Sequence, residues 1–361
     1  MTSHNTENLP VPVILAANPL RALWPCSTPD LPYSFAPDAS GISPVRNLVE
    51  TFLNHPGFVA PLLVVSDKAL TAAVAELRYF KERGVRAIVV PSDSRNGAAA
   101  VLAAIEAGSP GHDPALLYVP ATLKTTDLAG FARMGAEACE IARQRNRAVM
   151  FAARALDAQP GLHLKSGARD QFSGFLKVEK AWKQTDTDQA AAAREFGELF
   201  RLSGPVAAPA SLVIAQSSKI LPTLVSACTN ALTLADRAGC AIHPNAGFLS
   251  LAGAESIAGI LVAEPETLLI CQASVDMRVV QSWNDLEPAE IAARRPDAAI
   301  AGVDARIVQG HGGVFVFTEK AARLAEDHFN RAANRADGAA GRGIHADRSR
   351  AAAPSYATTI R

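Results

Sequence analysis

The chain has 361 residues, of which 49% are hydrophobic and 19% charged, so it can bury a large core. Its apolar runs are far shorter than the roughly 20 residues that cross a bilayer. Its 35 basic and 35 acidic residues leave no formal net charge at pH 7. These features argue against a membrane protein and against a nucleic-acid binder that relies on a basic face.

The N-terminal segment and the cysteines indicate the compartment in which the protein is expected. The N-terminus, MTSHNTENLP, lacks the basic-then-apolar pattern of a secretory signal. Scattered cysteines in odd number are typical of free thiols in a reducing compartment, and this chain has Cys26, Cys139, Cys228, Cys240 and Cys271. We therefore expect a cytoplasmic protein without disulfides.

The first half of the chain alternates short apolar runs with helical patterns. The apolar runs predict strands buried on both faces, at Val11–Leu15, Pro61–Val65, Ala87–Val90, Ala115–Val119 and Ala148–Ala153. Three helices are predicted between them: one capped by Ser66 and ending at Gly84, one over residues 97–108, and one over Asp127–Gln144. This alternation favours a mostly parallel sheet with helices on both faces, which binds ligands at the carboxyl ends of its strands.

The pattern is less regular after residue 155. Strands are predicted at Gly174–Val178, Ser211–Ala215, Thr267–Gln272 and Met277–Val280, and helices at Asp188–Leu199 and Lys219–Arg237. Residues 303–318 predict two short strands around a glycine-rich turn. Residues 331–361 hold six arginines and two aspartates with almost no large apolar side chains, which predicts a disordered tail. The expected organisation is an α/β domain over residues 1–300, a strand and helix extension over 301–328, and the tail over 329–361.

Six segments, taken together and in order, resemble the motifs of one enzyme family. The first contains Leu23, Trp24 and Pro25, and the others read PSDSRNGAAAVLAAI, ALLYVPATL, GFLKVEKAW, RLSGPVAA and SWNDLEPAE. They are similar to the motifs of the mannose-1-phosphate guanylyltransferases (GDP-mannose pyrophosphorylases), within the sugar-1-phosphate nucleotidyltransferase superfamily. The resemblance covers residues 11–290, and it depends on the order of the segments because no single one is specific. It implies a Rossmann-like, GT-A-like three-layer α/β sandwich with a mostly parallel mixed sheet.

The resemblance implies a reaction in which mannose 1-phosphate attacks the α-phosphorus of GTP and releases pyrophosphate. Such a reaction depends on positioning and on neutralising the charge of the triphosphate. A glycine-rich loop lets backbone N–H groups approach the phosphates, and an arginine and a lysine add positive charge. A bridging Mg²⁺ would need carboxylate ligands.

The sequence departs from the family at the nucleotide end of the expected site. The three loop glycines, the loop arginine and the first metal-binding aspartate are replaced here by Ala17, Asn18, Leu20, Ala22 and Thr122. Pro19 also removes a backbone donor from the loop. Losing a single donor to transition-state charge typically lowers a rate about 10² to 10³-fold, so these combined losses predict weak or lost catalysis.

The sugar end keeps more of the family's residues. The resemblance implies catalytic roles for Arg95 and Lys180 if the protein is active. It implies substrate contacts and one Mg²⁺ ligand at the remaining positions, which are Asn96, Glu179, Lys180, Ser203, Gly204 and, for the metal, Asp285. Within this set, Glu179 would face sugar hydroxyls and Lys180 the sugar phosphate.

Each of these residues also has a structural interpretation. The alternating KVEK segment is typical of a solvated strand face, and Asp285 is an ordinary residue for a turn. Arg95 and Asn96 suit the start of a helix. Cys240 and His243 lack a second pair at zinc-like spacing, so we expect no metal there.

Three functions stay open from the sequence. The first is a catalytically inert relative, a pseudoenzyme, that binds a sugar phosphate or nucleotide sugar, or acts as a regulatory subunit with an active paralogue or as a homo-oligomer. The second is a divergent but active pyrophosphorylase that uses Mg²⁺ and supplies GDP-mannose for polysaccharide synthesis. The third is an unrelated Rossmann-like protein. Neither nucleic acid nor membrane is expected as a partner.

Overall fold

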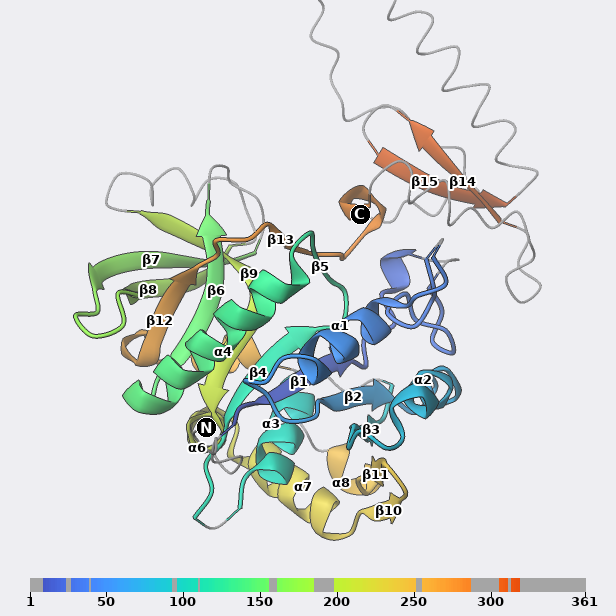
Figure 1. Cartoon of the computed structure of the whole chain (residues 1–361), viewed down its shortest axis with the longest axis horizontal. Helices are drawn as coiled ribbons and strands as arrows, with labels where there is room; N and C mark the ends of the chain where they lie inside the picture. Colours follow the sequence, from blue (N-terminus) through green and yellow to red (C-terminus); the bar gives the residue numbers. More distant parts are fainter. Residues whose placement is uncertain are drawn as a thin grey trace, which may run out of the picture.

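A computed structural model describes residues 9–23, 27–38, 40–92, 96–109, 111–155, 161–184, 198–250, 255–286, 305–310 and 313–318. Its main feature is an 11-stranded sheet with helices on both faces (Figure 1). The strands of this sheet are β1 Val11–Ala16, β2 Leu62–Ser66, β3 Arg86–Val90, β4 Ala115–Pro120, β6 Ala148–Arg154, β7 Gly161–Arg169, β8 Leu176–Gln184, β9 Leu199–Pro209, β10 Asp236–Ala238, β11 Ala241–His243 and β12 Leu268–Gln272.

The strand order is β10-β11-β3-β2-β1-β4-β9-β6-β12-β8-β7. The pairings give one direction to β1, β2, β3, β4, β6, β7, β11 and β12 and the opposite direction to β8, β9 and β10. The prediction of a mostly parallel mixed sheet is therefore confirmed. β9 also pairs with β7, so strands β6, β12, β8, β7 and β9 close into a ring at one end of the sheet.

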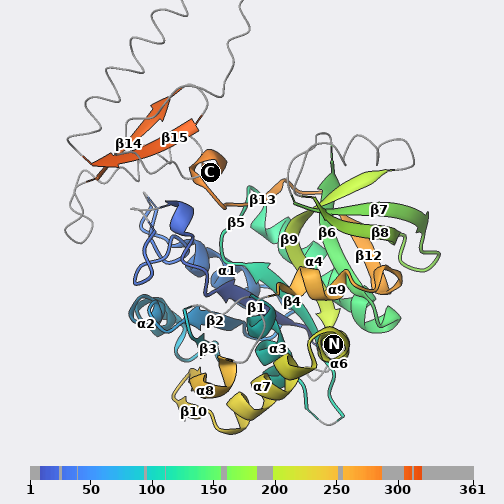
Figure 2. The same ribbon diagram turned by 180° about the vertical axis from the view of Figure 1, so that it is seen from behind.

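Helices cover the two faces of the sheet and make it the middle of three layers. The longer helices are α1 Pro44–Leu53, α2 Leu70–Leu77, α3 Asn96–Ala107, α4 Leu128–Arg145, α6 Ala210–Ile220 and α7 Pro222–Thr233, and the shorter ones are α8 Ala246–Leu249 and α9 Ile257–Leu261. One apolar core lies between the sheet and α1, α2 and α4 (Figure 1). A second core lies between the sheet and α3, α6, α7, α8 and α9 (Figure 2).

The buried strands form where the sequence predicted them. All five residues of β2 are buried, as are five of the six residues of β1, because both strands are covered on each face. The observed bounds of the first five predicted strands differ from the predicted ones by at most one residue at either end. The helices predicted over residues 97–108 and Asp127–Gln144 are α3 and α4, and the Asp127 carboxylate caps α4 by accepting the Gly130 N–H at 2.7 Å.

Several predicted elements were wrong. Ser66 ends β2 and accepts the Ala69 N–H at 3.2 Å, and α2 begins only at Leu70 and gives way to the 3-10 helix Arg78–Phe80 well before Gly84. The apolar run Ser211–Ala215 belongs to α6 instead of a strand, because such a run fits a buried helix equally well.

The helix predicted over Lys219–Arg237 is divided, since Pro222 begins α7 and its last residues form β10. The helix predicted over Asp188–Leu199 lies outside the described residues except at its end, where Leu199 begins β9. Residues 303–318 do contain two antiparallel strands, β14 Ala305–Gly310 and β15 Gly313–Thr318. The predicted tail lies outside the described residues, and the division into domains stays a prediction.

A small second sheet lies at the carboxyl end of β4. It pairs β5 Leu123–Thr125 with β13 Met277–Val279 in antiparallel register. β5 follows β4 closely, and the Ala121 N–H donates to the Leu15 carbonyl at 3.0 Å, which ties this end of β4 to β1. In the part of the chain that the structure describes, no helix is long and apolar enough to cross a bilayer.

Candidate functional site

The loop after β1, described at residues 17–23 and 27, takes the position that the resemblance gives to the phosphate-binding loop. Ala17 and Pro19 are buried and Asn18 is exposed. Leu20 has a φ of 46°, a left-handed conformation that a residue with a branched side chain adopts at a cost of about 1–2 kcal/mol. The loop thus keeps a turn that suits glycine although its residue there is leucine.

Two backbone N–H groups of this loop donate hydrogen bonds within the loop. The Leu20 N–H donates to the Asn18 side-chain oxygen at 3.0 Å, and the Leu23 N–H donates to the Leu20 carbonyl at 2.9 Å. Pro19 has no N–H to give. A phosphate cradle needs several N–H groups aimed at the ligand, so these three positions do not supply one. Trp24 and Pro25 lie outside the described residues.

Ser27 connects the loop to the segment that follows it. Its buried hydroxyl donates to the Pro19 carbonyl and accepts the Tyr33 N–H at 2.8 Å. Tyr33 is 1% exposed and lines a cavity of about 300 Å³. The inner end of the loop and the wall of this cavity are therefore joined through one serine.

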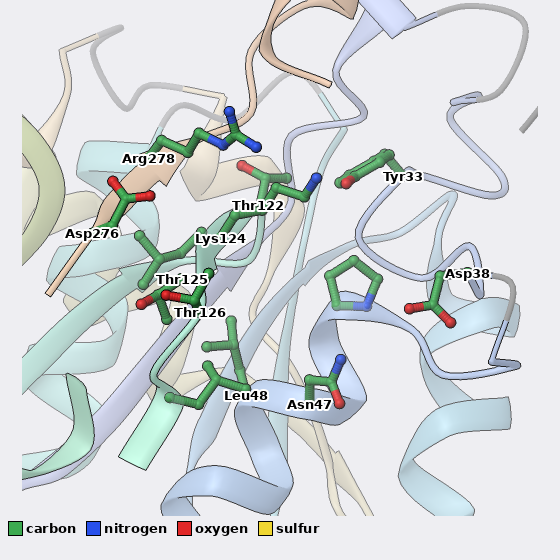
Figure 3. Close-up of a pocket in the computed structure, with 13 residues that line it drawn as sticks. Tyr33, Asp38, Asn47, Leu48, Thr122, Lys124, Thr125, Thr126, Asp276 and Arg278 are labelled. Carbon is green, nitrogen blue, oxygen red and sulfur yellow. The ribbon is translucent and has the colours of Figure 1, made fainter. Parts of the chain in front are cut away.

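The cavity lies between the segment around Tyr33, the start of α1, and the sheet of β5 and β13 (Figure 3). It adjoins the carboxyl end of β4, at an edge where ligands of parallel sheets bind. Thr122, the position of the missing aspartate, is part of its wall. The residues that follow β4 therefore line a cavity, whereas none of residues 17–23 after β1 does.

Side chains of both charges line this cavity. Lys124 and Arg278 are direct partners in the register of β5 and β13. Figure 3 shows the Arg278 guanidinium and the Lys124 side chain extending in the same direction, toward Tyr33, while Asp38 lies on the opposite side. The arrangement can therefore hold an anionic group on one wall and accept hydrogen bonds on the other.

The predicted Mg²⁺ ligands do not form a suitable donor set. Thr122 offers a neutral hydroxyl, whereas Mg²⁺ prefers carboxylates. Asp285 lies in the 3-10 helix Trp283–Asp285, and its Oδ2 accepts the backbone N–H groups of Gln281 and Ser282, each at 2.8 Å. That carboxylate stabilises its own turn, and we assign no step to Mg²⁺. Among the described residues, no group of three or more His, Cys, Asp or Glu side chains could hold a metal ion.

Two of the residues that the resemblance assigns to the sugar lie away from this cavity. Glu179 is exposed on β8 and pairs with Lys165 on β7 at 3.1 Å, and Lys180 is exposed with its Nζ 5.9 Å from the centre of the Trp182 ring. β8 is four strand positions from β4 in the sheet, so neither residue lines the cavity that contains Thr122. Their roles toward a sugar stay a prediction.

Ser203 and Gly204 lie within β9 instead of in a turn. Gly204 has a φ of 117°, and a Cβ there would lie 2.4 Å from Val279 Cγ2 and 3.3 Å from Pro120 Cγ. The glycine therefore allows β13 to approach β9 and the end of β4 closely. Asn96 begins α3, while its side chain and Arg95 lie outside the described residues.

The polar residues of the cavity include several that sequence reasoning did not select: Tyr33, Asp38, Asn47, Lys124, Asp276 and Arg278. Tyr33 had a signal, because it closely follows the segment of Leu23, Trp24 and Pro25 that resembles a family motif. The others had none, since β5 and β13 are far apart in the sequence and come together only through tertiary structure.

Buried titratable groups near the sheet are structural. Burial raises the pKa of Tyr118 well above its ordinary value, and its hydroxyl donates to the Ala100 carbonyl at 3.1 Å. Burial also raises the pKa of Cys228 to about 12, and burial together with the Glu137 charge does the same for Cys271. These thiols stay protonated and unreactive at neutral pH. The four described cysteines are free, as the sequence predicted.

Comparison with known proteins gives both similar sequences and similar structures. No family-level profile matches the chain. The xanthan biosynthesis protein XanB of Xanthomonas campestris pv. campestris is 25% identical over 224 residues, which are 61% of this chain and 46% of XanB. The chain thus spans about half the length of the curated relatives it matches.

Solved structures with the same fold extend the comparison. A Thermus thermophilus protein described as a mannose-1-phosphate geranyltransferase superposes with a TM-score of 0.65 at 18% identity, over 89% of this chain and 98% of that one. A Helicobacter pylori mannose-6-phosphate isomerase superposes with a TM-score of 0.61 at 16% identity, over 74% and 99%. A putative glucose-1-phosphate thymidylyltransferase from Bacillus anthracis gives 0.52 at 12%, over 81% and 97%. The chain therefore has the same α/β fold as these proteins.

Proposed function

We propose that the protein binds a sugar phosphate or a nucleotide sugar and has little or no nucleotidyltransferase activity. The observation that carries this proposal is the loop after β1, whose N–H groups at Leu20 and Leu23 are bonded internally while Pro19 has none. A triphosphate would have to break these bonds to be held by the loop. These internal bonds, and the absence of an N–H at Pro19, support weak binding of a triphosphate by the loop.

The names of the similar proteins support a role for this protein in the supply of nucleotide sugars. The matched protein XanB is described as a xanthan biosynthesis protein, and a structural neighbour is named for mannose 1-phosphate. We propose mannose 1-phosphate and GDP-mannose as the ligands to test first. The role would be regulatory or structural in the supply of precursors for a polysaccharide.

A pyrophosphorolysis assay tests the loss of catalysis. The full chain is incubated at high concentration with GDP-mannose, pyrophosphate and Mg²⁺, and GTP release is compared with a blank without protein. We expect no release above the blank. Release that depends on protein concentration and disappears when EDTA removes Mg²⁺ would establish the alternative, an active divergent pyrophosphorylase that uses Mg²⁺.

Calorimetric titration tests the binding half of the proposal. The full chain is titrated with mannose 1-phosphate and with GDP-mannose, and we expect saturable heat for at least one of them. Absence of binding to both ligands would refute the proposed function and favour an unrelated role for this fold.

A further inference from the structure

The second sheet, formed by β5 and β13, carries a pair of cationic side chains. Lys124 on β5 and Arg278 on β13 are directly opposite each other in the antiparallel register, so their side chains leave the same face of the sheet. Both line the cavity beside Tyr33 and Thr122. An anion placed between them would contact two positive charges at once.

The chemistry of the two cations suits a phosphate group. A guanidinium presents a planar fork of donors that matches phosphate oxygens, and an ammonium adds a compact second charge. Figure 3 shows the Tyr33 hydroxyl facing the end of the Lys124 side chain. Phosphate oxygens held there would also lie beside the hydroxyl of Thr122.

The rest of the cavity suits a body rich in hydroxyl groups. Asp38 and Asn47 lie across the cavity from the two cations and can accept hydrogen bonds from such groups (Figure 3). The Asp38 carboxylate would repel a triphosphate, which brings several charges and only a few hydroxyl donors. The volume of about 300 Å³ is at the lower end of the roughly 300–1,000 Å³ range of small-ligand sites, which favours a monosaccharide phosphate over a nucleotide sugar.

We propose that the cavity between α1, β5 and β13 binds a monosaccharide phosphate, with Lys124 and Arg278 holding the phosphate. This inference rests on the proposed function and moves its sugar-phosphate site from Lys180 on β8 to the β5–β13 pair. The Asp38 carboxylate and the Asn47 amide face the sugar. In this arrangement Thr122 contributes a hydroxyl to the phosphate where a metal-binding aspartate would repel it.

Titration of variants of the full chain with mannose 1-phosphate tests this assignment. Lys124→Met and Arg278→Met each remove one cation and are expected to weaken binding about 10-fold to 100-fold, as for the loss of a charge-assisted hydrogen bond. Lys124→Arg keeps the charge and should stay within about 3-fold of the unchanged protein. Lys81→Met, an exposed lysine outside the cavity, should have no effect on affinity. Circular dichroism and thermal melting check that each variant is folded.

The choice of ligand tests the second half of the assignment. Mannose 1-phosphate should bind more tightly than either mannose or inorganic phosphate, because the cavity offers partners to both halves of the molecule. Inorganic phosphate binding as tightly as mannose 1-phosphate would overturn the sugar part. GTP should bind more weakly than mannose 1-phosphate.

The outcomes separate this inference from the function on which it rests. If the unchanged protein binds neither mannose 1-phosphate nor GDP-mannose, the proposed function fails. If it binds mannose 1-phosphate, and Lys180→Met abolishes binding while Lys124→Met and Arg278→Met leave it unchanged, the proposed function stands and the present inference is overturned. Loss of binding in the cavity variants with retention in Lys180→Met supports it.

Discussion

The loop after β1 and the cavity beside β5 are joined through Ser27, yet they offer opposite surfaces to a ligand. In the loop, Leu20 and Leu23 use their backbone donors internally and Pro19 has none. In the cavity, Lys124 and Arg278 lie on one wall and hydrogen-bond acceptors on the other. This contrast indicates that a shared fold fixes where a ligand can approach, while individual side chains decide which ligand is held. Four substitutions test it.

Gly204→Ala should have the largest effect, because it would force β13 away from β9 and distort the cavity. The new Cβ would lie 2.4 Å from Val279 Cγ2 at a φ of 117°. We expect a loss of about 2–4 kcal/mol in the free energy of unfolding, measured by chemical denaturation. Gly41→Ala is the control, since its φ is 78° with nothing within 4 Å of the new Cβ, and it should lose only about 1–2 kcal/mol. Equal losses in the two variants would show that the approach of β13 is unimportant.

Ser27→Ala tests the connection between the two regions. It removes the acceptor of the Tyr33 N–H and the donor to the Pro19 carbonyl in a buried place, and should lower the free energy of unfolding by about 1–3 kcal/mol. Mannose 1-phosphate affinity should fall as well, since Tyr33 loses its support. Thr28→Ala, which removes an exposed bond to the Leu31 N–H, should lower stability by only about 0.5 kcal/mol. Unchanged affinity in Ser27→Ala would show that the loop does not influence ligand binding in the cavity through Ser27.

Tyr33→Phe examines the cavity alone, because the backbone bond to Ser27 is retained. Loss of the hydroxyl should weaken mannose 1-phosphate binding about 3-fold to 10-fold in calorimetric titration, the usual effect of one neutral hydrogen bond. Tyr79→Phe removes a hydroxyl from an exposed tyrosine outside the cavity and should leave affinity unchanged. Equal affinity of Tyr33→Phe and Tyr79→Phe would show that the Tyr33 hydroxyl does not contribute to ligand binding.

Leu20→Gly should have the smallest effect and addresses the loop alone. Relief of the left-handed conformation of Leu20 favours the folded state by about 1–2 kcal/mol, and the added freedom of the unfolded chain opposes it by about 0.5–1 kcal/mol. We expect a net gain of about 0.5 kcal/mol in chemical denaturation. Asn146→Gly, at a φ of 48° after α4, should give no gain because asparagine tolerates this conformation. A gain in Asn146→Gly and a loss in Leu20→Gly would contradict the assignment of strain.

Much of the parallel part of the fold could be predicted from the sequence, because a strand buried on both faces is a continuous apolar run. β1 and β2 are examples, and the apolar face of α4 was equally clear. β7 was not predicted, since GLHLKSGAR alternates irregularly with small and charged residues. Ser211–Ala215 was placed in a strand because five apolar and small residues do not distinguish a strand from a buried helix.

The candidate site could be predicted only in part. The motif segments correctly indicated the fold, and Thr122, which they singled out, lines the cavity, while its role stays a prediction. Lys124 and Arg278 could not be found, since the pairing of two three-residue strands depends on the whole domain. Gly204 was selected for a contact with substrate, whereas its position shows the packing reason for a glycine there.

The path of β9 has a consequence for how the chain folds. Its first residues pair with β7 and its last residues pair with β4, while β6 pairs with β9 on both sides of Gly204. β4 and β6 precede β9 in synthesis and are not neighbours, so the edges that face β9 stay unpaired until residues 199–209 arrive. Such non-local closure is slow and exposes strand edges to other chains. A nascent chain that ends before residue 199 should therefore depend on chaperones, and β9 is the segment whose insertion joins β4 to β6.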